Sequence, residues 1–596
     1  MSPDPSKPDT LRVANCSGFF GDRVSAAREM VDGGPIDVLT GDWLAELTMY
    51  ILHKTRERSG GYAGTFLRQM EDVLPTCIER GITVVSNAGG LNPEGLAQAI
   101  TELARRQGLD INVASVSGDD ITGRVPALQQ DGHQFINLDT GEPLPADASL
   151  VTANAYLGAR PIADALAAGA HVVVTGRVTD ASVIVGPALH AFGWRDDELD
   201  AIAGAVVAGH VIECGAQCCG GNYAFFEEIP NRERIGFPIA ELHPDGSSVI
   251  TKHPDSGGAV TVGTVTAQLL YEIGGPRYLS PDAVARFDTI DLSREGPDRV
   301  RISATKGEAP PPTLKVTANL NGGFRNSMTM AITGALVEQK ARMAAAAVWA
   351  GVPGGRASFE ETAEDLSGDL TGSGMSFLRL GVRGRNEKAV GRAFSGAVVE
   401  TSLSSFPGTF FTSAPSGAQA VARYWPTTID ATEVTAVVTV NGERMAGSPR
   451  TVDGGPATAV PEADSSTTTA ATADDRDRVE VPLWVLIGGR SGDKGGDANV
   501  GLWADTDEVA HWLLSEFGVD QFRAALPEVA PYRIDRYPLA NLRAVNFVVH
   551  GILGWGVASN LRLDTQAKGL AELLRSRSVV VPAALVASGN PAQRRR

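Results

Sequence analysis

Residues 213–222 combine a carboxylate, three cysteines and a glycine-rich turn, in the order Glu-Cys-Gly-Ala-Gln-Cys-Cys-Gly-Gly-Asn. A carboxyl group buried beside such a turn has a raised pKa, so it can donate or accept a proton near neutral pH. We therefore take Glu213 as a catalytic acid or base, with a surface or helix-end glutamate as the alternative. Cys214 is a candidate nucleophile, although buried cysteines also serve as small apolar side chains. Because only His210 lies nearby as a further soft ligand, no metal site is predicted.

Polar side chains follow nearly every apolar run in the first 240 residues. The runs are continuous and β-branched and alternate with helical patterns, which is typical of parallel strands buried on both faces. The carboxyl ends of parallel strands meet at one edge, so these side chains should converge there. The alternative for the aspartates is helix capping. The residues expected at this edge are Asn15, Ser17, Asp22, Arg23, Asp42, Asn87, Asp119, Asn154, Arg177 and Asp180.

These residues suggest a division of roles. Asp180 joins Glu213 as an acid–base candidate, and Arg177 and Arg23 are suited to hold a carboxylate or phosphate. The remaining edge residues and Asn222, which ends the cysteine-containing turn, are assigned to substrate binding. The opening turn at residues 16–22 lacks the G-x-G-x-x-G fingerprint, which disfavours a nicotinamide cofactor.

A second glycine-rich segment, residues 490–499, follows an apolar run near the C-terminus. It lacks the Gly-Lys-Ser/Thr ending of a phosphate-binding P-loop. Consecutive backbone N–H groups beside Arg490 and Lys494 would nevertheless form an anion-binding or domain-docking loop. The alternative is an ordinary hairpin turn. The glycine cluster at residues 551–556 is expected to pack close to this segment.

Composition excludes several classes of function. The chain has 596 residues, a formal net charge of −18, 43% hydrophobic residues and five irregularly placed cysteines. A strongly negative surface disfavours nucleic-acid binding, and the cysteines give no disulfide framework. The first ten residues are polar, and no apolar run approaches the roughly 20 residues that cross a bilayer. We expect a cytoplasmic protein that does not bind membranes.

The fold class expected from these patterns is α/β, organised in several parts. An α/β domain with a parallel sheet is followed by an α+β section and a small α+β C-terminal domain, which we expect to be ferredoxin-like. The middle section is expected to contain strands at 259–270, 299–304, 314–320 and 432–440, and helices at 331–350 and 386–399. The C-terminal domain is expected to contain strands at 544–549 and 579–585. The expected bounds are 1–10 for a polar arm, 11–240, 241–451, 452–479 for a disordered linker, and 480–590.

Long motifs resemble those of the acyclic terpene utilisation (AtuA-type) family. They include NCSGFFGDR at 15–23, NAGGLNP at 87–93, ANAYLGA at 153–159 and TGRVTD at 175–180. SGDKG and NLRAVNF in the tail are similar to the ferredoxin-fold domain usually fused behind that family. The resemblance implies a role beside enzymes that degrade citronellol, geraniol and other branched acids as coenzyme A thioesters, among them a biotin-dependent acyl-CoA carboxylase. It supplies no assigned catalytic residues.

From the residues and the resemblance together, we expect an enzyme acting on a branched or isoprenoid acyl-CoA. Hydration/dehydration or C–C cleavage, hence a hydratase or lyase, fits the acid–base candidates without a cofactor beyond the coenzyme A of the substrate. Glycine-rich turns would polarise the thioester carbonyl. The alternatives are a non-catalytic accessory or assembly subunit of the acyl-CoA carboxylase, or a regulatory acyl-CoA sensor. A homo-oligomer is expected, because symmetric oligomers are common among such proteins.

Overall fold

The computed structural model describes residues 7–371, 373–445 and 478–588. Its centre is a sheet in the order β11-β12-β8-β7-β1-β2-β3-β6-β4-β19-β20. Five neighbouring strands are parallel: β1 (Leu11–Asn15), β2 (Val38–Gly41), β3 (Thr83–Ser86), β6 (Val172–Thr175) and β4 (Val113–Ser117). Their residues are almost all buried because helices cover both faces, which confirms the α/β class.

Two groups of helices cover the two faces of the parallel strands. One face packs against α1 (Ala26–Asp32), α4 (Gly64–Glu79) and α5 (Pro93–Arg106). The other packs against α7 (Arg160–Ala167), α8 (Ser182–Phe192) and α9 (Leu199–Ile212). Asn92 caps α5: its Oδ1 accepts from the Gly95 amide (3.0 Å).

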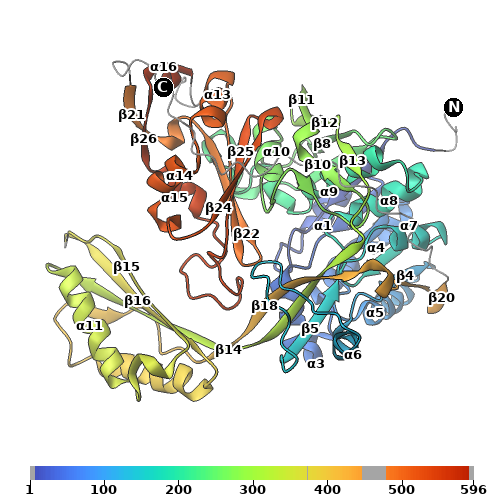
Figure 1. Cartoon of the computed structure of the whole chain (residues 1–596). Helices are drawn as coiled ribbons and strands as arrows, with labels where there is room; N and C mark the ends of the chain where they lie inside the picture. The colour runs from blue at the N-terminus through green and yellow to red at the C-terminus, as the bar shows by residue number, and fades with distance from the viewer. Residues whose placement is uncertain (1–6, 372, 446–477, 589–596) are drawn as a thin grey trace.

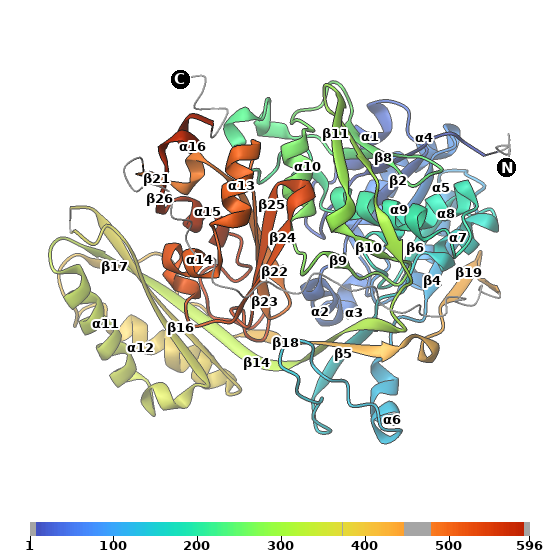
Figure 2. The ribbon, with the colours of Figure 1, turned by 45° about the horizontal axis from the view of Figure 1, so that its top comes forward.

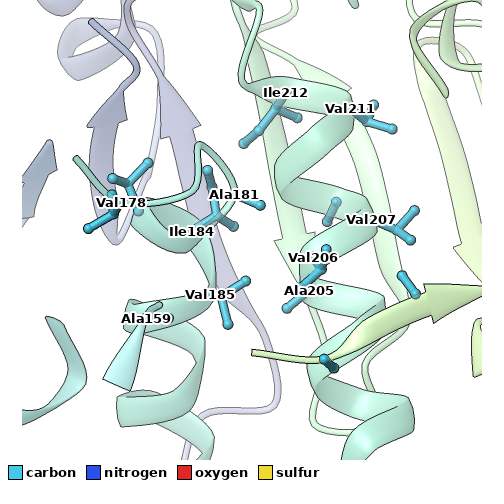
Figure 3. Close-up of a cluster of buried hydrophobic side chains, with 14 of the residues drawn as sticks. Ala159, Val178, Ala181, Ile184, Val185, Ala205, Val206, Val207, Val211 and Ile212 are labelled. Carbon is cyan, nitrogen blue, oxygen red and sulfur yellow. The ribbon is translucent and has the colours of Figure 1, made fainter. Parts of the chain in front are cut away.

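Helices α8 and α9 form the apolar centre of the molecule. Residues that face each other across the two helices, among them Ile184, Ala205 and Ile212, fill the space between them (Figure 3). A Cβ on Gly209 would lie 2.8 Å from Cα of Ala181, so only glycine permits this approach. Helix α9 is apolar all round because it is enclosed between the central sheet and a small sheet of β9 (Arg277–Tyr278), β10 (Val284–Arg286) and β13 (Lys306–Glu308).

Antiparallel strands extend the parallel core at both edges. β7 (Pro238–Leu242), β8 (Ser248–Lys252), β12 (Arg299–Ser303) and β11 (Asp291–Gly296) continue it beyond β1. β19 (Val437–Val440) and β20 (Glu443–Met445) continue it beyond β4. The middle of the chain is therefore built into the same sheet as the first 240 residues. Short helices α2 (Glu46–Lys54), α3 (Arg56–Ser59) and α6 (Val125–Gln130) border the core.

A single long strand links the core to a second sheet. The first half of β14 (Thr313–Thr333) pairs with β5 (Leu150–Ala155) and β18 (Gln419–Asp430). Its second half pairs with β16 (Met375–Gly384) and β17 (Thr409–Phe411), and β15 (Glu361–Gly368) completes the sheet. Helices α11 (Val337–Gly351) and α12 (Phe394–Glu400) cover one face. We call residues 324–416, apart from 372, the projecting subdomain; it stands away from the core (Figures 1 and 2).

The C-terminal domain is a four-stranded antiparallel sheet covered by helices, as predicted for a ferredoxin-like unit. The strand order is β22 (Gly488–Lys494), β23 (Asp497–Trp503), β25 (Ala544–Val549) and β24 (Ile534–Leu539). Helices α13 (Asp507–Ser515), α14 (Val519–Ala525) and α15 (Leu570–Arg575) accompany it. β21 (Arg478–Pro482) pairs with β26 (Ser578–Pro582), which runs into α16 (Ala583–Ser588). This domain lies between the core and the projecting subdomain (Figure 2).

The prediction of a strand at 259–270 is wrong, because residues Val262–Leu269 form helix α10. Threonines and valines in the segment favour a strand by composition. Thr261 instead starts a helix, since its Oγ1 accepts from the Thr264 amide (3.1 Å). Nearly every residue of the helix is buried, so packing on all sides overrides the local preference.

Several element boundaries also differ from prediction. The helix expected from residue 331 begins at Val337, since β14 continues to Thr333. Residues 431–433 are a 3₁₀ turn, so only the end of the 432–440 run is a strand. The strand expected at 579–585 stops at Pro582. Almost all of the linker predicted at 452–479 lies outside the described residues. In the described parts, no helix is long and apolar enough to span a bilayer.

Candidate active site

The structure brings most of the predicted polar residues together at the carboxyl edge of the parallel strands. Asn15 and Asn87, which follow β1 and β3, are fully buried. The buried members of this group are Asn15, Ser17, Asp42, Asn87, Asp119, Asn154 and Arg177. Buried polar groups of this number require mutual hydrogen bonds, and the edge supplies them.

Two asparagines position the first half of the site. Asn15 Oδ1 accepts from the Ser17 amide (2.9 Å), and its Nδ2 donates to the Glu213 carbonyl (3.2 Å). Asn87 Nδ2 donates to Asp42 Oδ1 (2.5 Å), while Asn87 Oδ1 accepts from the Trp43 amide (2.8 Å). The end of β1 is thereby fixed to the end of α9, and the turns after β2 and β3 are fixed to each other.

Asp119 connects the second half of the edge. Its Oδ2 accepts from the Arg177 amide (2.9 Å) and from Nδ2 of Asn154 (2.8 Å). Burial raises the pKa of the Asp119 carboxyl to about 7. Asn154 was expected to follow a strand of the parallel sheet. It lies instead on β5, which pairs with β14. It reaches Asp119 because β5 crosses the edge of the parallel sheet.

Arg177 is the central cation of the site and is almost completely buried. Its Nη1 donates to Asp180 Oδ1 (2.6 Å) and to the Leu44 carbonyl (3.0 Å). The guanidinium lies over the Tyr156 ring, 4.1 Å from its centroid. The Asp180 side chain keeps 28% of its surface exposed, so this ion pair joins the buried network to solvent.

Glu213 stands at the carboxyl end of α9 and is only 6% exposed. Burial raises the pKa of its carboxyl well above the usual value, and the charges of Asp180 and Glu272 raise it further. The charges of Arg177 and Lys494 lower this pKa but do not cancel the increase. Its Oε2 is buried without a hydrogen-bond partner among the described residues. Burial therefore favours the protonated, neutral form of Glu213, and its Oε2 is open to a partner that the described residues do not supply.

A buried histidine accompanies this carboxyl group. His210 Nδ1 lies 3.3 Å from Glu213 Oε1, one helical turn earlier on α9. Burial lowers the pKa of His210 to about 4, so its ring is neutral and does not form an ion pair with Glu213 at neutral pH. The ring packs against Tyr278 and Phe287, which stack on each other, with centroids 4.9 and 5.5 Å away.

Glu272 is a site residue that sequence reasoning missed. It follows α10, in a segment expected to be near a strand end, and no motif marks it. Its φ of 57° is unusual for a residue with a side chain. The conformation is held by a hydrogen bond from its amide to Asn499 Oδ1 (2.9 Å) and one from Lys494 Nζ to its carbonyl (3.1 Å). We call Asp42, Asp180, Glu213 and Glu272 the carboxylate cluster.

The C-terminal domain closes over this cluster. Residues 490–499 form the hairpin of β22 and β23, which confirms the hairpin alternative, and the hairpin also docks onto the core. Asn499 Nδ2 donates to the Leu270 carbonyl (2.6 Å), and Asn546 Nδ2 donates to the Gly274 carbonyl (2.6 Å). The glycine cluster at 551–556 does pack against the hairpin: the Leu553 amide donates to the Gly496 carbonyl (2.9 Å).

Arg490 joins the hairpin to the cysteine-containing turn. Its guanidinium lies 4.3 Å from the centroid of the Tyr271 ring and donates to Gln217 and to the Asn222 carbonyl (3.3 Å). Cys214 is half-buried, and burial, followed by the charge of Glu213, raises the pKa of its thiol well above the usual value. A thiol in this environment is not a ready nucleophile.

Two residues predicted at the carboxyl edge, Asp22 and Arg23, make contacts outside the buried network described above. Asp22 Oδ2 accepts from the Gly18 amide (3.0 Å) and so shapes the opening turn. Arg23 pairs with Glu29 (2.7 Å) and donates to the Ile235 carbonyl (2.7 Å). Within the described residues, no group of three or more His, Cys, Asp or Glu side chains is arranged to hold a metal ion.

Comparison with known sequences gives two matches that together span most of the chain. Residues 11–440 match the acyclic terpene utilisation family protein AtuA, and residues 481–580 match the AtuA ferredoxin-like domain. No curated protein and no solved structure matches the chain. The first match covers the central sheet, the carboxylate cluster and the projecting subdomain. The chain therefore belongs to the AtuA family, whose role is in acyclic terpene utilisation.

Proposed function

We propose that this protein is an acid–base enzyme that acts on a branched or isoprenoid acyl-CoA, by hydration/dehydration or by C–C cleavage. The observation that supports this most is the state of Glu213. Its buried carboxyl has a raised pKa and an unpartnered oxygen, and the partly exposed Asp180 lies near enough to influence that pKa. Elimination of water requires one group that donates a proton and a second that accepts one, and two neighbouring carboxyl groups can divide these roles.

The chemistry follows from this pair. In dehydration, Asp180 removes the proton α to the thioester carbonyl, and Glu213 transfers its proton to the leaving β-hydroxyl group. The C–O bond breaks, and the products are water and an α,β-unsaturated thioester. Hydration is the reverse. In C–C cleavage, the base takes the proton of the β-hydroxyl group instead, the Cα–Cβ bond breaks, and the acid protonates the resulting enolate.

The cations near the cluster are suited to stabilise the enolate oxygen in either reaction. The Arg177 guanidinium is fixed by Asp180, the Leu44 carbonyl and the Tyr156 ring, so it loses little freedom when charge develops. Lys494 enters from the C-terminal domain with its Nζ on the Glu272 carbonyl. The core and the C-terminal domain would then act together on one substrate.

The test is proton exchange and turnover with the purified full-length chain. It would be incubated in deuterated water with branched and linear 3-hydroxyacyl- and 2-enoyl-CoAs, and the thioesters analysed by mass spectrometry. We expect deuterium at the α-carbon and a mass change of one water with the branched thioesters. Cleaved products would identify the C–C reaction. Absence of both exchange and turnover across the panel would contradict the proposal.

A second candidate function is that of an accessory subunit for an acyl-CoA carboxylase. It is favoured by the projecting subdomain, where large apolar side chains are exposed at Leu336, Met343, Leu370, Leu403 and Phe410. Apolar groups gathered outside a core mark surfaces that bind protein. Co-purification of the carboxylase with the wild-type chain, lost after Leu403→Ser and Phe410→Ser together, would support this function.

A further inference from the structure

Arginines gather where the projecting subdomain faces the C-terminal domain. The loop between β25 and α15, residues 550–569, reaches down to β14 and β18 at this place (Figure 1). Arg325 Nη1 donates to the Asn560 carbonyl of this loop (3.3 Å), and Arg379 Nη1 donates to the Leu561 carbonyl (2.8 Å). The arginines of the group are Arg325, Arg379, Arg383, Arg385, Arg423 and Arg562. Such a concentration is unexpected in a chain with a net charge of −18.

The sheet places like charges directly opposite each other. Arg325 of β14 and Arg383 of β16 are register partners, so their side chains share one face of the sheet. Like charges in this position destabilise a sheet. Burial, followed by the charge of Arg379, lowers the pKa of Arg325; burial, followed by Arg383 and Arg385, lowers that of Arg423. The arrangement therefore costs stability in the absence of a further anion.

The carboxylates nearby neutralise only part of this charge. Glu360 and Glu361 pair with Arg383 (3.0 and 2.9 Å), and Glu360 also approaches Arg385 (3.3 Å). Asp365 pairs with Arg379 (2.9 Å). In the described parts of the chain, Arg325, Arg423 and Arg562 have no carboxylate within 4.0 Å. The buried Nε atoms of Arg423 and Arg562 also lack hydrogen-bond partners there.

Two arginines of this group, the unpaired Arg562 and the paired Arg383, line a cavity of about 250 Å³. We call it the arginine cavity. Its lining combines two charged strand residues, Glu361 and Arg383, with Tyr532 and the residues 551–555, Ser559, Asn560 and Arg562 of the loop. Arg423 lies behind Trp555, with its guanidinium 3.0 Å from the indole centroid. The volume is below the 300–1,000 Å³ typical of sites that enclose a whole ligand, so one end group fits here.

We propose that the arginine cavity binds the phosphate or diphosphate group of an organic phosphate. Guanidinium groups bind phosphate oxygens in a bidentate fashion, and they retain their charge when partly buried. An anion here would give Arg562 the partner that it lacks and, by neutralising part of the charge of Arg383, would reduce the repulsion between Arg325 and Arg383. Glu361, the one carboxylate in the lining, is already paired with Arg383 and so does not repel the ligand with its full charge.

The cavity is connected to the carboxylate cluster through the C-terminal domain. The Leu553 amide of the lining donates to Gly496 at the hairpin tip, and Lys494 of the same hairpin holds Glu272. If the proposed function is correct, the phosphates of the coenzyme A portion are the natural source of the anion. This identification rests on the proposed function, whereas the phosphate site itself rests only on the cavity.

The test is calorimetric titration of the full-length chain with pyrophosphate. We expect saturable binding that weakens with salt, because the contacts are ionic. Arg562→Gln should weaken it about 10- to 100-fold, the usual value of a hydrogen bond to a charged group. Arg562→Lys, which keeps the charge but loses the fork, should weaken it less. Arg342→Gln is the matched control, since Arg342 is exposed on α11 of the projecting subdomain. No binding to the wild type, or equal affinities of the Arg562→Gln and Arg342→Gln proteins, would overturn the proposal.

Further ligands identify the source of the phosphate. Coenzyme A, dephospho-coenzyme A and adenosine 3′,5′-bisphosphate would be titrated in the same way. If coenzyme A or its fragments bind the wild type, and Arg562→Gln weakens the binding of each one that does, coenzyme A is supported as the source. Binding of pyrophosphate without coenzyme A supports the site but assigns it to another organic phosphate. In turnover, Arg562→Gln should raise KM and leave kcat unchanged, whereas failure of the proposed function would appear as absent turnover in the wild type.

Discussion

The carboxylate cluster and the arginine cavity solve the same physical problem in opposite ways. Both gather like charges where water has little access. A carboxyl group can take up a proton and become neutral, and the raised pKa of Glu213 favours this neutral form. A guanidinium group does not lose its proton under ordinary conditions. The cluster is therefore stable by itself and can transfer protons, whereas the cavity needs an anion from outside.

The largest expected effect comes from removing the exchangeable proton of the cluster. Glu213→Gln keeps the shape and the neutral state of the side chain but cannot donate a proton. We expect kcat to fall 10²- to 10⁴-fold, the usual contribution of general acid–base catalysis, with little change in thermal stability. Turnover of the branched acyl-CoA found in the panel measures it, and Glu338→Gln on the exposed face of α11 is the control. Full activity would exclude Glu213 as the acid.

The protonation state of Asp119, at the carboxyl edge of the parallel strands, is tested by measuring stability at different pH values. Because the pKa of Asp119 is raised to about 7 in the fold, against about 4 when unfolded, the folded state binds more protons between these values. The contribution of Asp119 is fully present below pH 4 and is lost as pH rises through 7, by up to about 4 kcal/mol. Asp119→Asn should lack this loss. In urea unfolding, the free energy of unfolding of the variant relative to that of the wild type should be higher at pH 8 than at pH 5. The same relative value at both pH values would contradict this.

The connection between the two regions depends on Asn499. It is fully buried, donates to the Leu270 carbonyl and accepts from the Glu272 amide. Asn499→Ala leaves these backbone groups without partners, so we expect the free energy of unfolding to fall by about 2 to 3 kcal/mol. Urea unfolding measures this loss, and faster proteolysis between the core and the C-terminal domain would show where it occurs. Unchanged stability and cleavage would mean that the domains are held by other contacts.

The smallest expected effect concerns the fixed charge of the arginine cavity. Arg325→Met keeps much of the side-chain volume and removes the repulsion with Arg379 and Arg383. We expect the free energy of unfolding to rise by about 1 kcal/mol without ligand, a gain that should shrink or reverse with pyrophosphate present. Thermal unfolding with and without pyrophosphate measures it, against Arg342→Met as control. A destabilised variant without ligand would show that Arg325 is already neutralised.

The sequence predicted correctly those elements whose residue preferences and hydrophobic pattern agree with their burial in the fold. Continuous β-branched runs such as the one ending at Asn15 became buried parallel strands. The same pattern predicted that polar residues would meet at one edge, because parallel strands end on the same side. The segment containing Val262–Leu269 failed, since its burial on all sides outweighs the preference of threonine and valine for strands.

By itself, the sequence determined the fold class, the family and the candidate residues Glu213, Asp180 and Arg177. It did so because periodicity and long motifs are local properties of the chain. Only the tertiary structure decided that Glu272 joins the cluster and that Arg383 and Arg562, far apart in the sequence, line one cavity. Residues far apart in sequence carry no local signal of their contact, and pKa values depend on burial and on charges brought near by folding. That is why the contacts of Glu213 and Arg177, and the proposed phosphate site, became visible only in the folded chain.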